Sequence, residues 1–508
     1  MAGNDAVVLR KPDDVLRLID SGRIRPRHPG LVKIVALGSI FVDGWDLSSF
    51  GLGTVQMTSE FDLANSGISL HSLPFISAVV LIGAMIGGLF GGFLTDRVGR
   101  TKMLLITLFL LVGATALAAV APNPELFCLW RFLMGVGVGL DVPVALAFVA
   151  EYSAISNKGR NVTMAQVMST AAAAVAFFSI IPFHFIGVGE SLWRWAIGLG
   201  AVPALVVLIL RFIYTGESPM WAAKYQGLEK AAEILRKNYD LEVIVDDESK
   251  GVKQAKERFS PGSLLALFRA PYTVRTVLVS ILVVCQAAQY YAISLYTPKI
   301  FDELFPDDIV LVLVLSGLAN VIGVVGALFC VFGVQRLGLR LLGLIGFSIT
   351  ASCLAIISGA FTLLIAPISV VLIAVFYWAH NFGAGYVGTA MGTLSYPTAI
   401  RGIGGGYTQA ITRVGGIVGA AAFPILLDAQ GMQFTIGAIV LAPLIAIISL
   451  IVIRWDPVGK DVEEHEESEE SGGLEPGDVS AVEAGGESGG EAGRDPGFDS
   501  DPVPSETR

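Results

Sequence analysis

The sequence contains few charged residues. Asp, Glu, Lys and Arg make up only 15% of its 508 residues, and 54% of the residues are hydrophobic. Charged residues usually account for about a quarter of a soluble domain, and the mean hydropathy of this chain is +0.68. The composition therefore excludes an ordinary soluble protein and indicates a protein that is embedded in a lipid bilayer.

Cysteine and histidine are also scarce. The chain has four cysteines, Cys128, Cys285, Cys330 and Cys353. They lie in or beside apolar stretches without the spacing of a metal site or a disulfide framework. The five histidines are scattered, and the phosphate-binding pattern G-x-x-x-x-G-K-[ST] is absent. We therefore expect no metal, nucleotide or other cofactor, no nucleic-acid partner and no enzymatic activity.

The two ends of the chain lack long apolar runs. Residues 1–30 are polar, so no signal peptide is predicted, and PDDVLRLIDSGR at Pro12–Arg23 has the pattern of a short amphipathic surface helix. From Asp456 to Arg508 there are 17 acidic and 3 basic residues, with much Gly, Ser and Pro. Such a segment cannot bury enough apolar surface to fold. We expect a disordered tail that either solvates the protein or binds a regulatory partner.

Between these ends lie twelve apolar runs that are long enough to cross a bilayer as helices. Six of them precede and six follow a polar segment at about 215–272. The predicted spans are near 31–57, 70–95, 102–121, 126–150, 163–187, 193–214, 273–299, 308–333, 339–361, 363–393, 403–428 and 431–454.

Lysine and arginine gather in alternate loops between these spans. By the positive-inside rule, those loops and both termini face the cytoplasm of a plasma-membrane protein, which requires an even number of spans. The predicted domains are a cytoplasmic N-terminal segment 1–30, a six-helix bundle 31–214, a cytoplasmic central loop with short helices 215–272, a second six-helix bundle 273–454 and the acidic cytoplasmic tail 455–508.

The two halves share a weak internal repeat. LTDRVGRTKML after the second span is echoed by GVQRLGLRLLG after the eighth, which aligns Arg97 with Arg336 and Gly99 with Gly338. Paired halves of six helices are typical of transporters with a central cavity. Glycines at four-residue spacing in the second span, at Gly83, Gly87 and Gly91, predict close helix contacts that also suit helices in relative motion.

The first of these loops, GGFLTDRVGRTK, has a particular order of acid and bases. Asp96 can cap a helix, while Arg97 and Arg100 can reach carboxylates or helix C-termini opposite. This order resembles the loop signature of the major facilitator superfamily, G-x-L-x-D-R-x-G-R-[RK]. The resemblance implies an all-α integral membrane protein with twelve transmembrane helices in two pseudo-symmetric bundles.

Further motifs extend the resemblance over 31–454. LWRFLMGVGVGLDVPVALAFVAEYSAISNKGR, GESPMW, SLYTPKIF and SYPTAIRG are similar, in order and spacing, to motifs of the sugar and metabolite porter branch. The resemblance implies that an inner gate is closed by networks around Asp96 and Glu151. The predicted gate residues are Asp96, Arg97, Arg100, Glu151, Arg160, Arg336 and Arg401.

The first span contains two acids, in the stretch IFVDGWDLSSFG. Asp43 and Asp46 are three residues apart and share one helix face, and they lie ~18–23 Å along the helix from Leu31. Burying each charge in the bilayer costs about 2.5–3.5 kcal/mol. Two neighbouring carboxyls in such a site do not both ionise easily, so we expect at least one to load and release a proton near neutral pH.

Two charged residues of the fourth span belong with these acids. Arg131 is either a structural ion-pair partner or a switch that holds a carboxylate ionised until substrate movement breaks the pair. Asp141 lies in GVGVGLDVP, which resembles G-x-G-x-G-G-D-Y-P of phosphate symporters, and DGWD resembles organic-acid and phosphate symporters. We assign Asp43, Asp46, Arg131 and Asp141 to proton coupling.

Sugar-porter features are mixed with departures from them. By position, Gln166 and Gln286 match glutamines that the resembled branch uses to bind sugar hydroxyls, whereas Thr389 replaces its stacking Trp. Losing that aromatic surface weakens a hexose assignment. Within other spans, Arg413 could attract an anion or pair with a helix end, and we read His380 as a packing residue. The candidate substrate-binding residues are Gln166, Gln286, Tyr290, Tyr291, Thr389 and Arg413.

These patterns together predict a monomeric secondary transporter that works by alternating access. We expect proton-coupled symport of a small polar or anionic metabolite, which is an organic acid, a sugar or phosphate. One alternative is a transport-fold nutrient receptor, but Asp43, Asp46 and Arg131 argue against it because a receptor has no need of proton-carrying groups. The other alternative is a proton-coupled exporter, since no residue encodes the direction of transport.

Overall fold

The structure is a computed structural model that describes residues 7–21, 24, 29–64, 67–151, 155–214, 216–239, 241–246, 261–306, 308–360, 366–396 and 398–458. Side chains are described in these ranges except at residues 20, 29–36, 92–93, 96, 146–151, 155–163, 165, 261–263, 335, 398–399 and 401–402. The predicted acidic tail lies outside the described residues apart from 455–458.

The first half of the chain folds into long helices at the predicted spans. They are α2 (Pro29–Leu52), α4 (Leu73–Val98), α5 (Arg100–Ala119), α6 (Pro124–Glu151), α7 (Ile155–Ile186), α8 (Leu192–Gly198) and α9 (Ala201–Tyr214). A short helix α3 (Thr54–Glu60) and a 3-10 turn η1 (Gly189–Ser191) join them. The predicted span 193–214 is divided into α8 and α9.

The second half repeats this plan. Its helices are α13 (Thr273–Ser294), α14 (Thr297–Leu304), α15 (Ile309–Gly359), α16 (Ala366–Ala379), the π-helical segment η3 (His380–Ala384), α17 (Gly385–Leu394), α18 (Thr398–Ile439) and α19 (Leu441–Val452). Gly338 (φ 72°) bends α15, and Gly431 (φ 77°) bends α18. Because only glycine adopts such a φ at little cost, each of these long elements makes two spans.

Ten stretches of the described residues are long and apolar enough to cross a membrane. One of them, Ile403–Val452, runs across the bend at Gly431 and contains two spans. Helix α2 adds one more, since its 24 residues have an apolar composition. The all-α architecture with twelve spans, predicted from the apolar runs, is confirmed.

Glycines hold helices within the first bundle in close contact. A Cβ atom added at Gly135 of α6 would stand 2.0 Å from the main-chain oxygen of Val80 in α4. Corresponding contacts of 2.2 Å at Gly83 and 2.3 Å at Gly87 join the same two helices. Backbones this close favour van der Waals packing in lipid, so the predicted close helix contact is present between α4 and α6.

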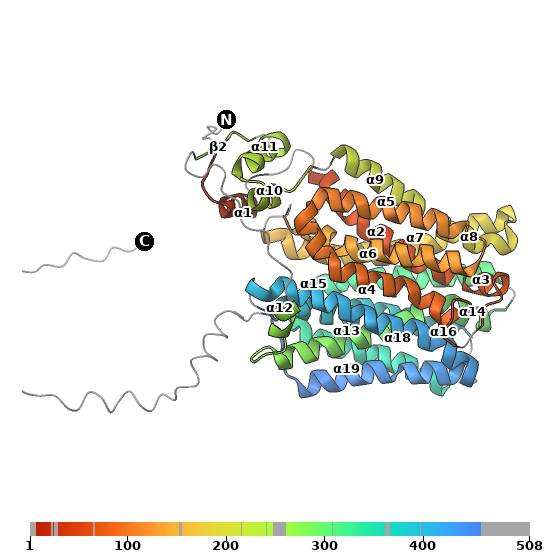
Figure 1. Cartoon of the computed structure of the whole chain (residues 1–508). Coiled ribbons are helices and arrows are strands. Elements are labelled where there is room, and N and C mark those ends of the chain that lie inside the picture. Colours follow the sequence, from red (N-terminus) through yellow and green to blue (C-terminus); the bar gives the residue numbers. More distant parts are fainter. Residues whose placement is uncertain are drawn as a thin grey trace, which may run out of the picture. The chain divides into compact units, whose positions relative to one another are not determined.

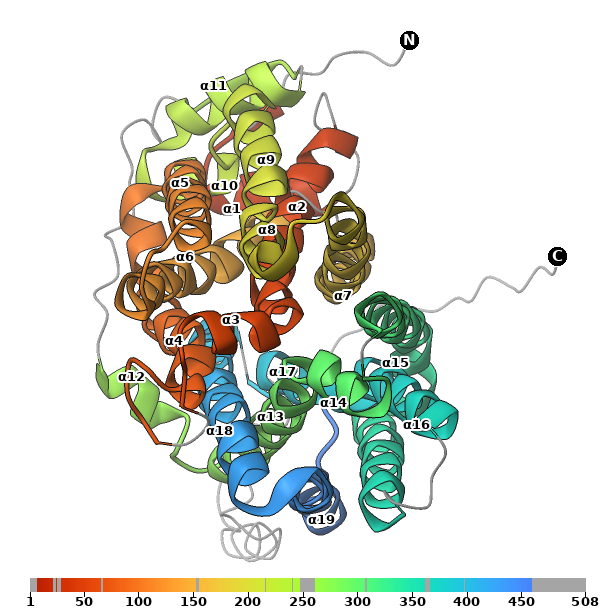
Figure 2. The same cartoon turned by 90° about the vertical axis from the view of Figure 1, so that its right-hand side faces the viewer.

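The two bundles meet along two pairs of helices. In the end-on view of Figure 2, α4 lies beside α18 and α7 lies beside α15, and these pairs are in contact. Ser77 of α4 donates a hydrogen bond of 3.0 Å to the main-chain oxygen of Ala420 in α18, and the Tyr296 hydroxyl donates one of 2.8 Å to the same oxygen.

One end of the first bundle, the near end, carries a small domain outside the spans. It contains β1 (Val7–Leu9), α1 (Pro12–Asp20), α10 (Pro219–Tyr225), α11 (Leu228–Tyr239) and β2 (Val243–Val245), and these elements lie together in Figure 1. Helix α1 matches the predicted amphipathic helix. The parallel pairing of β1 with β2, with Val7 opposite Val243, was not predicted. A further short helix, α12 (Pro261–Ala266), precedes α13.

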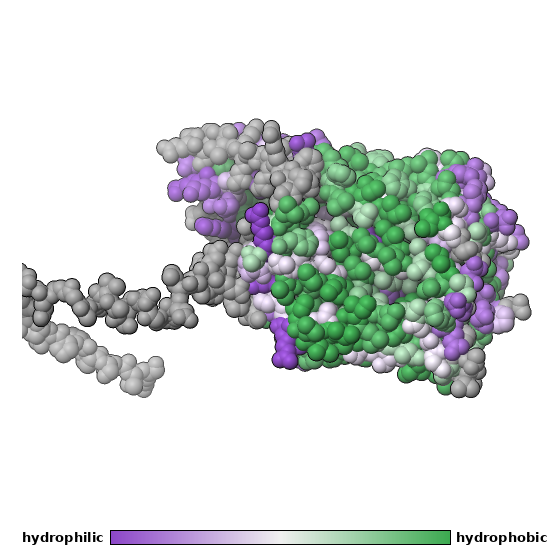
Figure 3. Space-filling view, turned by 60° about the horizontal axis from the view of Figure 1, so that its bottom comes forward, coloured by the Kyte–Doolittle hydropathy of each residue, from purple (hydrophilic) through white to green (hydrophobic). Residues whose placement is uncertain are grey.

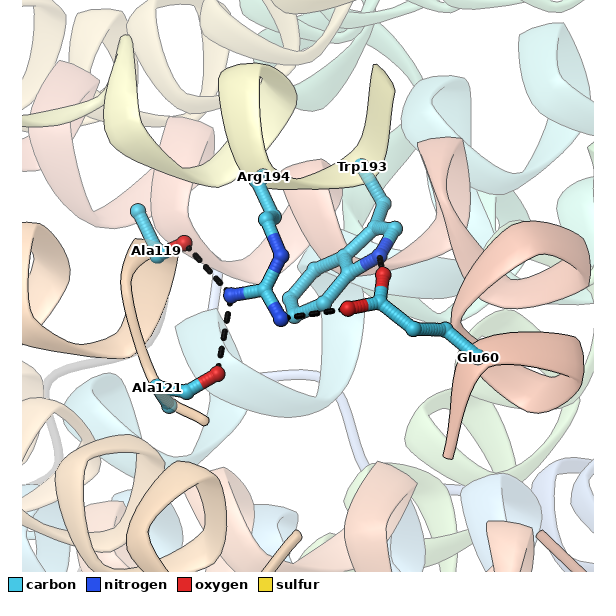
Figure 4. A network of polar contacts seen from close by, with 5 residues as sticks. All are labelled: Glu60, Ala119, Ala121, Trp193 and Arg194. Atoms are coloured by element: carbon cyan, nitrogen blue, oxygen red, sulfur yellow. Dashed lines mark hydrogen bonds and ion pairs between the residues drawn. The ribbon is translucent and has the colours of Figure 1, made fainter. Parts of the chain in front are cut away.

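The other end, the far end, has a brace that joins three elements (Figure 4). Arg194 of α8 donates to Glu60 of α3 at 2.5 Å and to the main-chain oxygens of Ala119 and Ala121 at 3.1 and 2.8 Å. The indole of Trp193 donates to the second carboxyl oxygen of Glu60 at 2.6 Å. The brace therefore fixes the far ends of α3, α5 and α8 to one another.

An apolar belt covers the sides of the helices between the two ends. In Figure 3 hydrophobic residues dominate the middle of the visible face, and hydrophilic residues gather toward its ends. Large side chains in this belt are exposed, for example Phe109 (64%), Phe212 (77%) and Phe332 (73%). A continuous apolar surface of this kind is typical of contact with lipid. The four cysteines are buried and form no disulfide.

Candidate functional site

Helix α2 carries two acids into the interior of the first bundle. The relative exposure of Asp43 is 4% and that of Asp46 is 0%, so neither carboxyl faces the lipid. Gly44 lies between them, and a Cβ atom there would stand 2.5 Å from the main-chain oxygen of Ser169 in α7. Close packing of α2 against α7 thus fixes the rotation of the helix that bears both acids.

Asp46 belongs to a cluster toward the far end, made of Asp46, Thr115 and Arg131 (the far cluster). The Thr115 hydroxyl lies 3.3 and 3.2 Å from the two carboxyl oxygens of Asp46. Arg131 is fully buried and donates from Nη1 to the main-chain oxygen of Asp46 at 3.1 Å. Its guanidinium carbon also lies 5.0 Å from the centre of the Phe50 ring.

The predicted partnership of Arg131 with the acids of α2 therefore has a specific form. Arg131 holds the backbone of Asp46, and its Nε and Nη2 atoms have no hydrogen-bond partner among the described residues. The described residues show no contact within 4 Å between its guanidinium and a carboxylate. Arg131 therefore keeps two buried donors that have no acceptor among the described residues, although it lies beside an acid.

Asp141 belongs to a second cluster, made of Thr107, Asp141 and Arg211 (the near cluster). The Arg211 Nη1 atom lies 3.4 Å from Asp141 Oδ1, and both side chains are fully buried. Thr107 donates to the same carboxyl oxygen at 2.7 Å, and Arg211 donates to the main-chain oxygen of Leu104 at 3.1 Å. The other oxygen, Asp141 Oδ2, has no hydrogen-bond partner among the described residues.

Arg211 was missing from the residues predicted from the sequence. It lies three residues before the end of the apolar run that forms α9, where a basic residue resembles an ordinary cytoplasmic flank. The sequence nevertheless contained a usable signal. An arginine in a membrane span normally has an acid partner, and no basic partner had been assigned to Asp141.

Asp43, one turn before Asp46 on α2, belongs to neither network of contacts among the described residues. Both of its carboxyl oxygens are buried and accept no hydrogen bond from the described residues. The charged groups that act on Asp43 at longer range are the acids Asp141 and Asp46 and the bases Arg413 and Arg211. An ionised carboxylate in this position would have neither a hydrogen bond nor a contacting cation, which is costly in a protein interior.

The second bundle contributes an arginine and a group of aromatic rings. Arg413 of α18 is half-buried and donates to the hydroxyl of Tyr291 at 3.1 Å. The ring of Tyr290 stacks on His380, with centroids 4.5 Å apart and an angle of 15° between the planes. His380 begins the π-helical segment η3, and π segments occur frequently at functional sites.

Polar groups of the two bundles meet between α7 and η3. Gln166 and Thr170 of α7 both donate to the side-chain oxygen of Asn381, at 3.2 and 3.0 Å. The predicted residue Gln166 is thus engaged across the bundles by a partner that the sequence did not single out.

The remaining predicted substrate residues make few contacts. Gln286 is buried and Thr389 is half-buried, and neither side chain has a hydrogen bond among the described residues. Gln289, one turn beyond Gln286, is completely buried with both amide atoms unpartnered in the described part of the chain.

The predicted inner gate is described only in part. The side chains of Asp96, Glu151, Arg160 and Arg401 lie outside the described residues. Those of Arg97 and Arg336 are exposed, and that of Arg100 is half-buried. The role of these seven residues in gating stays a prediction.

The aligned glycines of the internal repeat have a common role. Gly99 (φ 107°) separates α4 from α5, and its Cα faces the carboxyl of Glu217, since an added Cβ would stand 2.6 Å from Oε2. Glu217 accepts a hydrogen bond of 3.2 Å from the main-chain N–H of Thr101. A carboxylate from the segment after α9 therefore accepts a hydrogen bond from a free main-chain N–H group in the first turn of α5.

The second half uses Asp456 in the same way. An added Cβ at Gly338 would stand 2.6 Å from Asp456 Oδ2, and that oxygen accepts from the main-chain N–H of Arg340 at 2.9 Å. Asp456 was missed because it begins the acidic stretch that was read as a tail. In both halves, the acid that follows the sixth span caps the third span.

These observations define the class of protein. Twelve spans in two repeated halves, buried charges inside the first half and an apolar belt are the properties of a multi-pass membrane transporter and not of an enzyme.

Comparison with known proteins agrees. A family model described as sugar (and other) transporter matches residues 31–467. The xylose transporter XylE of E. coli, in a partially occluded inward open conformation, has the same fold with a TM-score of 0.69 at 19% identity, over 85% of this chain and 99% of that one. The chain therefore belongs to the sugar (and other) transporter family and has the major facilitator fold.

Several curated relatives are transporters as well. The inner membrane metabolite transport protein YgcS of Escherichia coli is 27% identical over 84% of this chain and 91% of its own length. The arabinose-proton symporter of Bacillus subtilis is 25% identical over 78% and 88%, and the glucose transporter GlcP of Staphylococcus epidermidis is 26% identical over 76% and 86%.

Proposed function

We propose that this transporter couples the movement of a proton to the uptake of a small polar or anionic metabolite. The observation that carries the proposal is Asp43, a buried carboxyl without a hydrogen bond or a contacting cation among the described residues. Such a group is stable inside a protein when it holds a proton. The relative named an arabinose-proton symporter supports the same coupling ion.

The second bundle supports an anionic substrate, of which an organic acid is the leading case. Arg413 is partly accessible, and within the described residues it donates a hydrogen bond to the neutral hydroxyl of Tyr291. A guanidinium binds carboxylates and phosphates strongly through charge-assisted hydrogen bonds. The half-buried ring of Tyr290, whose centroid lies 5.7 Å from that of Tyr291, adds an apolar face for the body of the substrate.

The two bundles are electrostatically connected in a way that supports coupling. The charge of Arg413 in the second bundle reaches Asp43 in the first. An anion bound at Arg413 would cancel that charge, so protonation of Asp43 and binding of the anion favour each other. Binding linkage is reciprocal, and the carrier would then load both together.

Alternating access follows from the packing in this proposal. Close glycine contacts make each bundle rigid, whereas the bundles touch each other through α4 with α18 and α7 with α15. We propose that the near end, with both termini, faces the cytoplasm because the basic loops lie there, that the protein acts as a monomer, and that the predicted gate residues close this end.

Transport by the purified protein in proteoliposomes tests the function. Labelled benzoate, succinate, phosphate and xylose are offered with and without an inward proton gradient. The proposal expects accumulation of at least one anion only when the gradient is imposed. Equal uptake with and without the gradient would contradict proton coupling. Accumulation of xylose alone would contradict an anionic substrate.

A further inference from the structure

A row of neighbouring side chains connects Arg413 in the second bundle to α7 in the first. The row starts at Tyr291, whose hydroxyl accepts a hydrogen bond from Arg413. The ring of Tyr290 follows, with its centroid 5.7 Å from that of Tyr291 and 4.5 Å from that of His380. Asn381, next to His380 in η3, then meets α7. A substrate that binds Arg413 through its anionic group and lies along Tyr290 would therefore extend toward the polar contacts between η3 and α7.

The contacts of Asn381 decide which atom of its amide is the donor. Asn381 is buried, and its Nδ2 atom lies 3.0 Å from the main-chain oxygen of Tyr377. A carbonyl oxygen only accepts hydrogen bonds, so the atom beside it must be the amide nitrogen. Inverting the amide would set two buried oxygens against each other, which is costly. The other atom, Oδ1, is therefore an acceptor, and the Thr170 hydroxyl donates to it at 3.0 Å.

Asn381 in turn decides the orientation of Gln166. The Gln166 atom that lies 3.2 Å from Asn381 Oδ1 must be a donor, so it is Nε2. The remaining atom, Oε1, accepts no hydrogen bond from the described residues, and it is not buried as the amide of Gln289 is. The side chain of Gln166 as a whole is half-buried. Gln166 therefore offers an accessible oxygen, which accepts hydrogen bonds and cannot donate them.

We propose that Asn381 is a positioning residue that turns the Gln166 oxygen toward the substrate and thereby selects a hydroxylated monocarboxylate, an acid with one carboxylate and a hydroxyl group on its chain. The inference rests on the anionic substrate proposed above and adds the group that the substrate carries at its other end. Asn381 acts through Gln166 and does not itself contact the substrate.

The chemistry of the two ends explains this selection. The carboxylate binds the guanidinium of Arg413, and a hydroxyl group donates to Gln166 Oε1. A dicarboxylate would bring a second carboxylate to Gln166, where an ionised carboxylate has no proton to donate. Its oxygens would then face the Gln166 oxygen without a hydrogen bond, which costs binding free energy. An acid with a plain alkyl chain would leave that oxygen without a donor.

Isothermal titration calorimetry of the full-length protein in nanodiscs, without a proton gradient, measures this preference. The probes are three six-carbon acids: gluconate carries hydroxyl groups, hexanoate carries none, and adipate carries a second carboxylate. We expect the Kd of gluconate to be at least about tenfold lower than those of hexanoate and adipate, as one added hydrogen bond would give. Hexanoate or adipate binding as tightly as gluconate, or no binding of gluconate, would overturn the proposal.

The variant Asn381→Leu separates positioning from packing. Without Asn381 the amide of Gln166 can turn over and donate from Nε2 to a carboxylate, so the Kd of adipate should fall about tenfold. The Kd of gluconate should change by less than about threefold, because a hydroxyl group accepts hydrogen bonds as well as donating them. A merely structural defect would weaken the binding of both acids. An unchanged or higher Kd of adipate in the folded variant would contradict the proposal.

Asn320 of α15 offers a matched control. It is buried as well, and its Nδ2 atom donates to the main-chain oxygen four residues earlier, that of Ser316, at 2.9 Å. Among the described residues it makes no hydrogen bond to the other bundle. Asn320→Leu should therefore keep the wild-type preference for gluconate over adipate, and a gain in adipate binding there too would contradict the proposal. If Asn381→Leu does not fold, Asn381→Ala removes the same groups without adding volume.

The same titrations distinguish a failure of this inference from a failure of the proposed function. Calorimetry records binding without transport, so its outcome does not depend on proton coupling. Sorbitol, the uncharged alcohol with the carbon skeleton of gluconate, tests the anion. Sorbitol binding as tightly as gluconate would contradict the anion at Arg413, whereas adipate binding as tightly as gluconate would contradict the orientation of Gln166.

Discussion

Substituting Gly135 by alanine tests whether the backbones of α4 and α6 are in close contact. The added Cβ would lie 2.0 Å from the main-chain oxygen of Val80 and 2.8 Å from its carbonyl carbon. Carbon and oxygen atoms of this kind approach to about 3.5 Å at best, so α4 and α6 would have to separate locally by about 1.5 Å. The backbones are equally close at the neighbouring Gly139, where an added Cβ would lie 2.1 Å from the main-chain oxygen of Ala84. This second contact would open together with the first.

The magnitude follows from two opposing effects. Overpacking a well-packed contact costs about 1–3 kcal/mol, and backbone atoms cannot move aside as a flexible side chain can, so the upper part of this range applies. Alanine's better helix propensity offsets up to about 1 kcal/mol. We therefore expect Gly135→Ala to lower the free energy of unfolding by roughly 2 kcal/mol.

Gly113 offers a matched control in the adjacent helix α5. A Cβ atom at Gly113 would have nothing within 4 Å, so Gly113→Ala should be neutral or stabilising by up to about 1 kcal/mol. Unfolding of both purified variants by titration with a denaturing detergent, followed by tryptophan fluorescence, measures the difference. Equal stability of Gly135→Ala and Gly113→Ala would refute the close-contact reasoning.

Four further predictions concern single side chains. Asp43→Asn should lower the gradient-driven accumulation ratio of a transported anion to about 1, because no proton coupling remains, with counterflow exchange retained; undiminished accumulation would contradict the assignment of the proton to Asp43. Arg413→Gln should raise KM for that anion about tenfold or more with little change in kcat, and an unchanged KM would exclude Arg413 from the site. Asp456→Ala should destabilise the protein by about 1 kcal/mol through the lost cap, measured by the same detergent titration, whereas the exposed control Asp13→Asn should have no effect. The main-chain N–H groups of Arg10 and Lys11, just before α1, donate hydrogen bonds to Asp14 and lower its pKa below the ordinary value of 3.8. Protection of α1 from hydrogen exchange, corrected for intrinsic rates, should therefore persist above pH 3.8 and fall as the pH drops below it. The variant Asp14→Asn should show no such step.

The positions of the helices could be read from the sequence because span length is a local property. The run predicted at 102–121 is α5, Arg100–Ala119, and the run predicted at 273–299 is α13 with the start of α14. Polar residues inside such runs stand out for the same reason, which is why Asp43, Asp46 and Asp141 could be singled out before the structure was known.

The contacts of these residues could not be read in the same way. Arg211 resembled a basic flank, and Asp456 resembled the start of a tail. Their partners, Asp141 and the main-chain N–H of Arg340, lie 70 and 116 residues away in the chain. Similarly, the pairing of β1 with β2 depends on segments that are more than 230 residues apart.

The sequence by itself determined that the chain spans a membrane twelve times in two related halves and that it buries acids in the first of them. Hydropathy and repeated motifs suffice for this, since each span must be apolar along its own length. The tertiary structure alone decided that Asp46 lies beside Thr115 and Arg131, whereas Asp141 lies beside Thr107 and Arg211. The reason is physical: a charge finds its partner through the rotation and register of packed helices, which no single span encodes.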